Sequence, residues 1–179
     1  MEFKKYGLLF SSVKVEDAPF IYELRTNEKL GLHLSATSLK IEDQEKWIRG
    51  YEEREKLAQE FYFLCHNGLD KFGLNRVYDL KSDSFEIGSW IFKPHLDEAI
   101  PILGDLAVRD FGFSILTSKN KYCTFNVKKK NLKVLRYHKM FKPETVNEDE
   151  ENWYFKLSEE NFNSQKNKLL KILGHGNSK

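Results

Sequence analysis

The side chains that could do chemistry are few and scattered along this sequence. The five histidines and two cysteines show no spacing typical of metal ligands. There is no G-x-S-x-G turn that would present a nucleophilic serine, and no Walker loop for a nucleotide phosphate. Metal chemistry and a serine nucleophile of that type are therefore not expected. What remains is a reaction that needs little covalent machinery, with single side chains moving protons.

The composition narrows the classes of protein further. A chain of 179 residues predicts one domain with an ordinary core, and a net charge of +2 argues against a dedicated nucleic-acid binder. Cys65 and Cys123 lie in apolar, strand-like patterns, which favours buried free thiols over a disulfide or a nucleophile. No apolar run approaches the roughly 20 residues of a membrane span, and no signal peptide is recognisable. We expect a cytoplasmic protein without membrane or nucleic-acid partners.

One stretch of the chain, Ser84 to Phe141, organises the expected elements. The alternation from Ser84 to Phe92 predicts a strand, which Pro94 ends because proline has no N–H to donate. Apolar residues at helical spacing follow from Ala99 to Phe113. A strand over Lys121 to Val127 and a helix over Asn131 to Phe141 complete the series. Strand, helix, strand, helix indicates an α/β unit with a parallel pair at its centre.

The remaining patterns place antiparallel strands around this unit. We predict further strands over Tyr6 to Lys14, Glu60 to His66, Phe72 to Leu80, near Glu144 and over Asn152 to Leu157, and helices over 16–25, 41–57 and 161–173. The expected fold is α/β, with a mixed, mostly antiparallel sheet of about seven strands and four or five helices. Residues 1–158 would form the functional domain, and residues 159–179 a C-terminal helix or frayed tail of the same domain.

A family resemblance rests on four motifs in the order that the family has. E-I-G-S-W-I-F-K-P (Glu86 to Pro94) resembles the "E-I-G-Y-W-I-x-P" strand of the GNAT superfamily of N-acetyltransferases. V-K-K-K-N followed by Y-H-K-M-F is similar to its "V-x-x-x-N…Y-E-K-x-G-F". V-E-D-A-P-F-I-Y-E-L-R and D-Q-E-K-W-I resemble its first two helices. The resemblance covers residues 7–158 and is nearest to the branch that acts on nucleotide-linked amino sugars, including the flagellar pseudaminic acid type.

The resemblance implies a splayed central pair of strands and a defined activity. An acetyl or short acyl group would pass from a pantetheine thioester, in the first place acetyl-CoA or another acyl-CoA, to the amine of a nucleotide-linked deoxyamino sugar by direct attack. Pantetheine would lie along Trp90, Ile91 and Phe92, where backbone N–H groups face the thioester carbonyl. An ordinary core strand would show the same alternation, so the flanking motifs carry the argument. No metal is implied.

The loop after Pro94 departs from the family. The family has a glycine-rich "R-G-x-G-x-G/A" there, whose amides bind the pyrophosphate of the donor at a helix N-terminus. This chain has H-L-D-E-A-I-P-I-L-G instead. Amides of Asp97, Glu98, Ala99 and Ile100 could still bind a phosphate, but the two carboxylates oppose it. Coenzyme A would bind in an altered way, helped by Lys128, or an acyl carrier protein would present the same arm without the adenosine diphosphate.

The resemblance also implies a contact to the donor and an acid for the departing thiolate. Asn131 corresponds to an asparagine that contacts pantetheine, although it is equally suited to cap a helix. An ungapped count from Asn131 places the family tyrosine at His138, whereas a count backward from K-M-F places it at Tyr137. We prefer Tyr137, since a phenol of pKa about 10 can protonate a thiolate of pKa about 8.5.

Bases and acceptor contacts are assigned with less support from the motifs. Glu86 on the donor strand and His33 in the first variable loop are candidate bases; Glu86 could equally be an ordinary surface carboxylate, and a structural role is favoured for His33. Candidate substrate-binding residues come from the first two helices and the loop between them: Arg25, Asn27, His33 and Trp47. The expected partners are the nucleotide-linked amino sugar as substrate and, as the alternative donor, an acyl carrier protein. The expected oligomeric state is a monomer or a homodimer. The alternatives are acetylation of a protein N-terminus, as in the ribosomal-protein branch, and an idle pantetheine-binding module.

Overall fold

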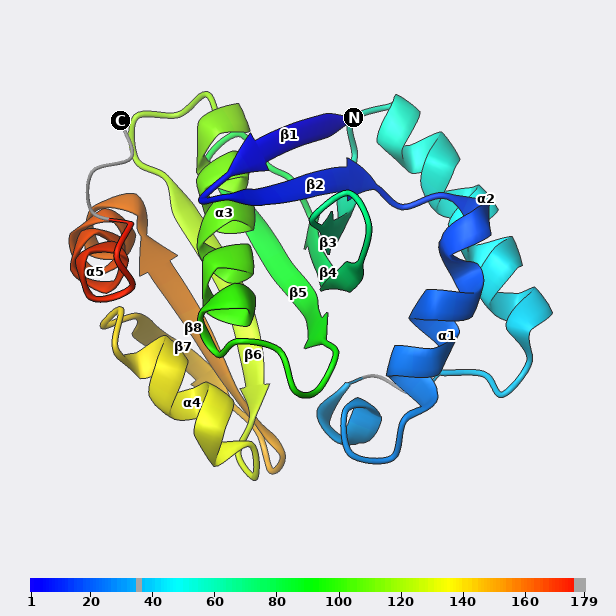
Figure 1. Ribbon diagram of the computed structural model, residues 1–179. Coiled ribbons are helices and arrows are strands. Elements are labelled where there is room, and N and C mark those ends of the chain that lie inside the picture. Colours follow the sequence, from blue (N-terminus) through cyan, green and yellow to red (C-terminus); the bar gives the residue numbers. More distant parts are fainter. Residues whose placement is uncertain (35–36, 176–179) are drawn as a thin grey trace. The chain divides into compact units, whose positions relative to one another are not determined.

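The computed structural model describes residues 1–34 and 37–175, and these form a mixed α/β fold (Figure 1). The strands are β1 (Glu2–Lys5), β2 (Leu8–Ser12), β3 (Phe61–His66), β4 (Lys71–Tyr78), β5 (Ser84–Phe92), β6 (Tyr122–Lys128), β7 (Glu144–Glu148) and β8 (Asn152–Ser158). The helices are α1 (Ala18–Thr26), α2 (Ile41–Lys56), α3 (Ala99–Ile115), α4 (Leu132–Lys139) and α5 (Glu159–Ile172), with short 3-10 turns η1 (Val15–Asp17) and η2 (Gly31–His33). The expected fold class is confirmed, with eight strands in the described residues where about seven were predicted.

The additional strand comes from the N-terminus. The strand expected from Tyr6 begins instead at Leu8, because Tyr6 and Gly7 have φ of 52° and 80° and form a tight turn. Two successive positive φ angles match the twist of a two-residue hairpin. Glu2–Lys5 then pairs antiparallel with Leu8–Ser11, from Glu2↔Ser11 to Lys5↔Leu8. The sequence prediction therefore located the second strand of this hairpin and missed the first.

The sheet order is β1-β2-β3-β4-β5-β6-β8-β7, so β5 and β6 are neighbours in its interior. They are parallel, with a register that runs from Ser84↔Tyr122 to Glu86↔Thr124. The central parallel pair is therefore confirmed, while its splay farther along stays a prediction. The chain forms two compact units, the first of residues 1–78 and 88–108 and the second of residues 79–87 and the chain from 109 onwards. β5 contributes its start to the second unit and its end to the first.

In the first unit, α1 and α2 pack together over one face of the strands (Figure 1). Their buried side chains join those of β3, β4 and β5 in one cluster that includes Phe20, Ile21, Leu24, Ile48, Tyr51, Tyr62, Leu64, Leu74 and Ile91. α2 runs from Ile41 to Lys56, close to the predicted 41–57, and buries Ile48 and Tyr51 at i and i+3. This cluster fixes the two helices against the strands that carry the site described below.

The packing of β5 between β4 and α3 in the first unit depends on two glycines. A Cβ at Gly73 in β4 would lie 2.3 Å from the Phe92 ring, and one at Gly104 in α3 would lie 2.6 Å from it. Real side chains do not approach so closely, so both positions need glycine while the ring is there. Phe92 is buried accordingly, and it holds the end of β5 between β4 and the first half of α3.

The second unit is built around β6, β8 and β7, which pair antiparallel in that order. Its core is rich in phenylalanine, with Phe113 stacked on Phe162 at 5.2 Å and Phe141 on Phe162 at 5.9 Å between ring centroids. Residues 159–172 form α5, capped by Ser158, whose hydroxyl accepts from Asn161 N at 3.2 Å. The C-terminal helix is thus present, and the division into residues 1–158 and 159–179 stays a prediction. None of the helices in residues 1–34 and 37–175 has the length and apolar character needed to cross a membrane.

Candidate functional site

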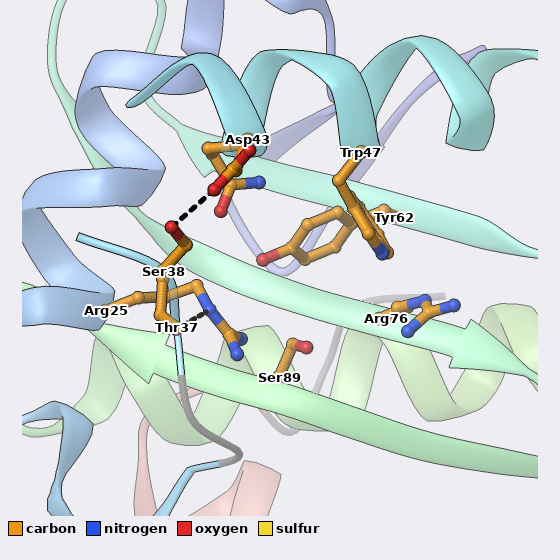
Figure 2. Close-up of a pocket in the computed structure, with 9 residues that line it drawn as sticks. Arg25, Thr37, Ser38, Asp43, Trp47, Tyr62, Arg76 and Ser89 are labelled. Atoms are coloured by element: carbon orange, nitrogen blue, oxygen red, sulfur yellow. Dashed lines mark hydrogen bonds between the residues drawn. The ribbon is translucent and has the colours of Figure 1, made fainter. Parts of the chain in front are cut away.

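The first unit contains a cavity of about 320 Å³ between α1, α2 and the strands (Figure 2). Its walls come from helix ends, from the segment before α2 and from three strands. The residues that line it are Arg25, Thr37, Ser38, Asp43, Gln44, Trp47, Tyr62, Arg76 and Ser89. Two arginines and one aspartate make the ionic lining +1, that is, +2 and −1. The arrangement offers an electropositive, partly aromatic site for a small molecule.

Arg76 is held in place by a buried carboxylate. Glu60 is buried and receives hydrogen bonds from Nη2 of Arg76 and, at 2.8 Å, from Nε of Arg54. The guanidinium of Arg76 lies over the rings of Trp47 and Tyr78, at 5.0 and 4.6 Å from their centroids. A planar cation between rings and clasped by a carboxylate loses little freedom on binding a ligand. Arg76 is therefore a pre-organised donor at the wall of the cavity.

Arg25 forms the second cationic wall from the last turn of α1. Its Nε donates to the hydroxyl of Thr37 at 2.8 Å, which joins the helix end to the segment before α2 (Figure 2). The negative wall residue Asp43 accepts from the Ser38 hydroxyl at 2.5 Å. One Asp43 oxygen is thus engaged by Ser38, and the cavity retains a surplus of positive charge and hydrogen-bond donors.

Aromatic side chains form the remaining wall. The Trp47 ring is 37% exposed, stacks on Tyr51 at 6.0 Å and meets the edge of Tyr62 at 5.8 Å between centroids. Tyr62 lies opposite Arg76 in the β3–β4 register, so their side chains share one face of the sheet. Ser89 lies in β5 with φ of 52°, an angle that marks a local irregularity in a strand. The Trp47 ring is the more exposed of the two aromatic rings that line the cavity.

Of the expected acceptor residues, Arg25 and Trp47 line the cavity, whereas Asn27 and His33 are not part of its lining. Asn27 follows α1, and its Oδ1 accepts from the backbone of Lys29 at 3.0 Å and Leu30 at 3.1 Å. His33 ends η2 and is partly exposed. Asn27 therefore has a clear role in a turn, and the proposed roles of both residues in substrate binding stay predictions.

In the first unit, the residues expected to bind the acyl donor lie at the end of β5 and the start of α3. Trp90 donates from Nε1 to the carbonyl of Pro101 at 3.0 Å, and Ile91 and Phe92 are buried. Asp97 uses its Oδ1 to accept from Ala99 N at 2.8 Å and its backbone oxygen to accept from Ile100 N at 3.0 Å. Two of the four amides expected to face a phosphate are therefore already engaged.

Glu98 between them is exposed, and Ala99 is the first residue of α3. The segment thus presents a carboxylate at the position where the family has bare amides. The loop after Pro94 therefore differs from the glycine-rich loop of the family in its structure as well as its sequence, because Asp97 caps the start of α3.

The expected residues of the second unit lie on β5, β6 and α4. Glu86 is half-buried and stands in register with Thr124. Lys128 ends β6, and its carbonyl accepts from Asn131 N at 2.8 Å. Asn131 caps α4, because its Oδ1 accepts from Val134 N at 3.4 Å. The capping alternative for Asn131 is therefore observed, and the donor contact stays a prediction.

The neighbours Tyr137 and His138 have very different environments. His138 is 6% exposed, and its Nδ1 lies 3.2 Å from Nη2 of Arg109. Burial and then the Arg109 cation hold the pKa of His138 well below its usual value, so the imidazole is neutral. Tyr137 is half-buried against His138 and Phe141, at 5.1 and 5.4 Å between centroids. A neutral imidazole lacks the proton of an imidazolium, which favours Tyr137 as the acid.

The sequence argument missed most of the cavity wall, above all Tyr62, Arg76 and Ser89. The alternation of side chains along a strand predicts on which side of β3 Tyr62 lies and on which side of β4 Arg76 lies, but it treats each strand separately. Only the register Tyr62↔Arg76 shows that the two are opposite each other. A search for polar side chains among the inward positions of both strands could have selected them. In the described residues, no group of three or more His, Cys, Asp or Glu side chains is arranged to hold a metal ion.

Comparison with solved structures gives the family. The structure of FdhC, described as a nucleotide-linked sugar GNAT, superposes with a TM-score of 0.81 and 31% identity over 94% of this chain and 96% of that chain. Ribosomal-protein-S5-alanine acetyltransferase from Vibrio fischeri (TM-score 0.71, 13% identity, 88% and 96% covered) shares the fold. So does spermidine N-acetyltransferase from Vibrio cholerae, solved with CoA and spermine (0.72, 14%, 88% and 99%).

No protein-family model matches the sequence, and no curated protein is significantly similar to it. The similarity to FdhC nevertheless extends over nearly the whole of both chains at 31% identity. The chain therefore belongs to the GNAT superfamily of N-acetyltransferases and is an N-acyltransferase.

Proposed function

We propose that the protein transfers an acetyl or short acyl group from acetyl-CoA, or another acyl-CoA, to the amine of a nucleotide-linked deoxyamino sugar. The observation that carries this proposal is the pair of guanidiniums, Arg25 and Arg76, on the walls of a cavity beside the half-exposed Trp47. Guanidinium groups bind phosphate oxygens through charge-assisted, often bidentate, hydrogen bonds. An aromatic face accepts a planar base by stacking. The diphosphate and base of a sugar nucleotide match both features.

The comparisons support this choice of acceptor over two others. FdhC, which has 31% identity to this chain, is a nucleotide-linked sugar GNAT. The spermidine and ribosomal-protein enzymes are similar at 14% and 13% identity, which extends to the fold alone. A polyamine is a cation and would be repelled by a lining of net charge +1. The charge of the cavity therefore favours an anionic acceptor.

The donor is proposed to be an acyl-CoA, in line with the CoA complex of the spermidine enzyme. The resemblance assigns pantetheine contacts to Trp90–Phe92 and Asn131 and a phosphate contact to Lys128. The amides of Ala99 and Ile100 are engaged by Asp97, so they contribute less to phosphate binding than the glycine loop of the family does. An acyl carrier protein, which lacks the adenosine diphosphate, is the alternative donor.

The proposed reaction is a direct attack. The nitrogen lone pair of the neutral amine forms a C–N bond with the thioester carbonyl, and backbone N–H groups near Ile91 or Phe92 stabilise the oxyanion. A base, Glu86 or His33 directly or through water, takes the proton of the substrate ammonium before the attack, and the nitrogen loses its second proton to solvent as the amide forms. The C–S bond then breaks, and the Tyr137 hydroxyl protonates the leaving thiolate. The resulting phenolate regains a proton from solvent, so no oxidant or reductant is needed.

A substrate screen tests the proposal. Wild-type protein is incubated with acetyl-CoA or acetyl-pantetheine and with nucleotide-linked amino sugars, spermidine or an alanine-initiated peptide, and products are identified by mass spectrometry. Acetylation of a nucleotide-linked amino sugar at the highest kcat/KM is the expected result. Preference for the peptide or for spermidine would contradict the proposed acceptor. Bound CoA without turnover on any amine would instead indicate an idle module.

A pair of arginine variants connects the activity to the cavity. Arg76→Gln removes a cation of the wall, and we expect the acceptor kcat/KM to fall about 100-fold, since charge-assisted bonds contribute about 1.5–3 kcal/mol. Arg49→Gln is the matched control on α2, because Arg49 is exposed and pairs only weakly with Glu45 at 3.9 Å. Equal activity of the two variants would place the acceptor elsewhere.

A further inference from the structure

Two buried tyrosines of the first unit differ in how their hydroxyl groups are used. Tyr51 in α2 and Tyr62 in β3 are 0% and 2% exposed, and their rings meet edge to face at 6.0 Å between centroids. Both belong to the same apolar cluster. The two rings are therefore packed in similar ways, and the two residues differ in the hydrogen bonds of their hydroxyl groups.

The Tyr51 hydroxyl is used by the fold. It accepts a hydrogen bond from Tyr62 N at 2.9 Å and donates one to the carbonyl of Tyr62 at 3.2 Å. This hydroxyl thus satisfies both backbone groups of one residue in β3. Its role is to fix the strand against α2, and no ligand is needed to explain it.

The Tyr62 hydroxyl is buried without such a partner. No donor or acceptor in the described part of the chain meets full hydrogen-bond geometry with it, although the Ser89 hydroxyl and the Arg25 guanidinium lie at the margin of hydrogen-bonding range. Burial raises the pKa of Tyr62, so the phenol keeps its proton, while Arg25 and Ser89 are close enough to oppose that shift. Figure 2 shows this oxygen pointing into the cavity, toward the side where Arg25 and Ser89 lie. A desolvated O–H aimed into a cavity is costly to the fold unless a water or a ligand accepts its proton.

The chemistry of its surroundings indicates what the ligand atom is. Arg25 has only donors to offer, and its positive charge disfavours a protonated amine beside it. A phenol with a raised pKa next to a cation is a hydrogen-bond donor and not a general base. The atom that fits is an oxygen with free lone pairs.

We propose that Tyr62 is a specificity-determining residue of the acceptor site, whose hydroxyl donates a hydrogen bond to a phosphate or hydroxyl oxygen of the bound acceptor. This inference rests on the proposed function, because it takes the cavity to be the acceptor site. The inference concerns a residue that the family motifs do not single out, and it states the kind of ligand atom with which that residue forms a hydrogen bond. Tyr62 binds and selects the acceptor, and it takes no part in moving protons.

The experiment compares Tyr62→Phe with Tyr51→Phe, a matched control that removes an equally buried hydroxyl 6.0 Å away between rings. For Tyr62→Phe we expect the acceptor kcat/KM to fall about 10-fold for a neutral oxygen and about 100-fold for a charged one, with the donor KM unchanged. Its Tm should equal or exceed that of wild type, because an unpaired buried hydroxyl is removed. Tyr51→Phe should lower Tm and leave the acceptor kcat/KM near wild type.

A second arm distinguishes the two kinds of oxygen. If the oxygen belongs to a phosphate, the loss in Tyr62→Phe disappears when the free amino sugar replaces the nucleotide-linked one. If it is a sugar hydroxyl, the loss remains with the free sugar and disappears with the deoxy analogue that lacks this hydroxyl. A loss that survives removal of every such oxygen would overturn the assignment.

The two proposals fail in distinguishable ways. If nucleotide-linked sugars are acylated and Tyr62→Phe matches wild type, the function holds and the role of Tyr62 is wrong. If another oxygen-bearing amine proves to be the substrate, the Tyr62→Phe effect on that amine decides the role of Tyr62 alone. A clear drop in Tm for Tyr62→Phe would overturn the inference without any substrate, because the hydroxyl would then be bonded within the protein.

Discussion

Arg76 in the first unit and Arg109 in the second both lie against aromatic rings, but their guanidinium groups are used differently. Arg76 faces the cavity, is clasped by Glu60 and lies 5.0 Å from the centroid of Trp47. Arg109 is 0% exposed, donates to Cys123 Sγ at 3.2 Å, approaches Nδ1 of His138 at the same distance, and lies 4.7 Å from the Phe125 centroid. One guanidinium lines the cavity, and the other is bonded inside the fold.

The comparison shows that the burial of a guanidinium and the groups around it determine whether it is available to a ligand. The Glu60 carboxylate orients Arg76, and the proposed function assigns the remaining donors of the guanidinium to a phosphate. Cys123 Sγ and the neutral His138 are among the groups that hold Arg109 where water cannot reach it, and burial together with the Arg109 cation lowers the pKa of His138. The predictions below test this division, from the largest expected effect to the smallest.

Tyr137→Phe should have the largest effect, since it removes a proposed catalytic acid and retains the ring. General acid catalysis contributes typically about 10²- to 10⁴-fold, so kcat should fall by roughly that factor while donor binding persists. His138→Gln is the paired variant on α4, and it should retain most of the activity because the neutral His138 belongs to the Arg109 network. Steady-state kinetics would reverse the assignment if His138→Gln lost kcat and Tyr137→Phe did not.

Arg109→Ala should destabilise the protein more than a change at any cavity arginine. Breaking a buried charged network typically costs about 3–5 kcal/mol, here with a cavity added where the side chain filled the core. Urea denaturation should show this loss in the free energy of unfolding. Arg49→Ala, on the surface, should change it by no more than about 0.5 kcal/mol. Similar stabilities for the two variants would mean that the Arg109 contacts contribute little.

Arg25→Gln should affect binding and leave the fold nearly intact. We expect about a 10- to 100-fold loss in acceptor kcat/KM, because one charge-assisted contact to a phosphate is removed. The dependence of kcat/KM on ionic strength should also weaken, since screening acts on the remaining cation only. Kinetics at low and high salt measure both. An unchanged salt dependence would show that Arg25 does not face a charged group of the acceptor.

The smallest expected effect is a dependence of stability on pH. The pKa of His138 is lower in the folded state, so below about pH 6.5 the unfolded chain binds the additional proton. The free energy of unfolding is therefore undiminished above that pH and decreases as the pH falls. Between pH 6.5 and pH 5.5 the loss from this one group is about 1 kcal/mol. Urea denaturation at several pH values should show this decrease in the free energy of unfolding for wild type and not for His138→Gln. The same pH dependence in both proteins would argue against the role of His138.

The elements of this fold were largely predictable because local patterns determine them. The alternation before Pro94 predicted β5, and the apolar spacing of Ile48 and Tyr51 predicted α2. The turn at Tyr6 was missed, since a non-glycine residue at positive φ leaves no strong signal in the sequence.

The cavity was less predictable, because its walls depend on pairing between distant residues. Arg25 and Trp47 were selected through the family motifs, whereas Tyr62 and Arg76 meet through the β3–β4 register. The role of Glu60 in holding Arg76 depends on a contact between residues 16 positions apart. A single sequence does not contain the register, so it cannot identify the polar residues that share a face.

The Phe92 ring between Gly73 and Gly104 has a consequence for how related sequences vary. Neither glycine can gain a side chain while the phenyl group remains, since the added carbon would lie 2.3 or 2.6 Å from it. A smaller residue at position 92 would make room for an alanine at Gly104, whereas at Gly73 the added carbon would still lie 2.6 Å from the carbonyl oxygen of Ile91. Across relatives, the sizes of the residues at positions 92 and 104 should therefore covary, while position 73 should stay glycine, so a change of the ring to leucine would open an evolutionary path at position 104 alone.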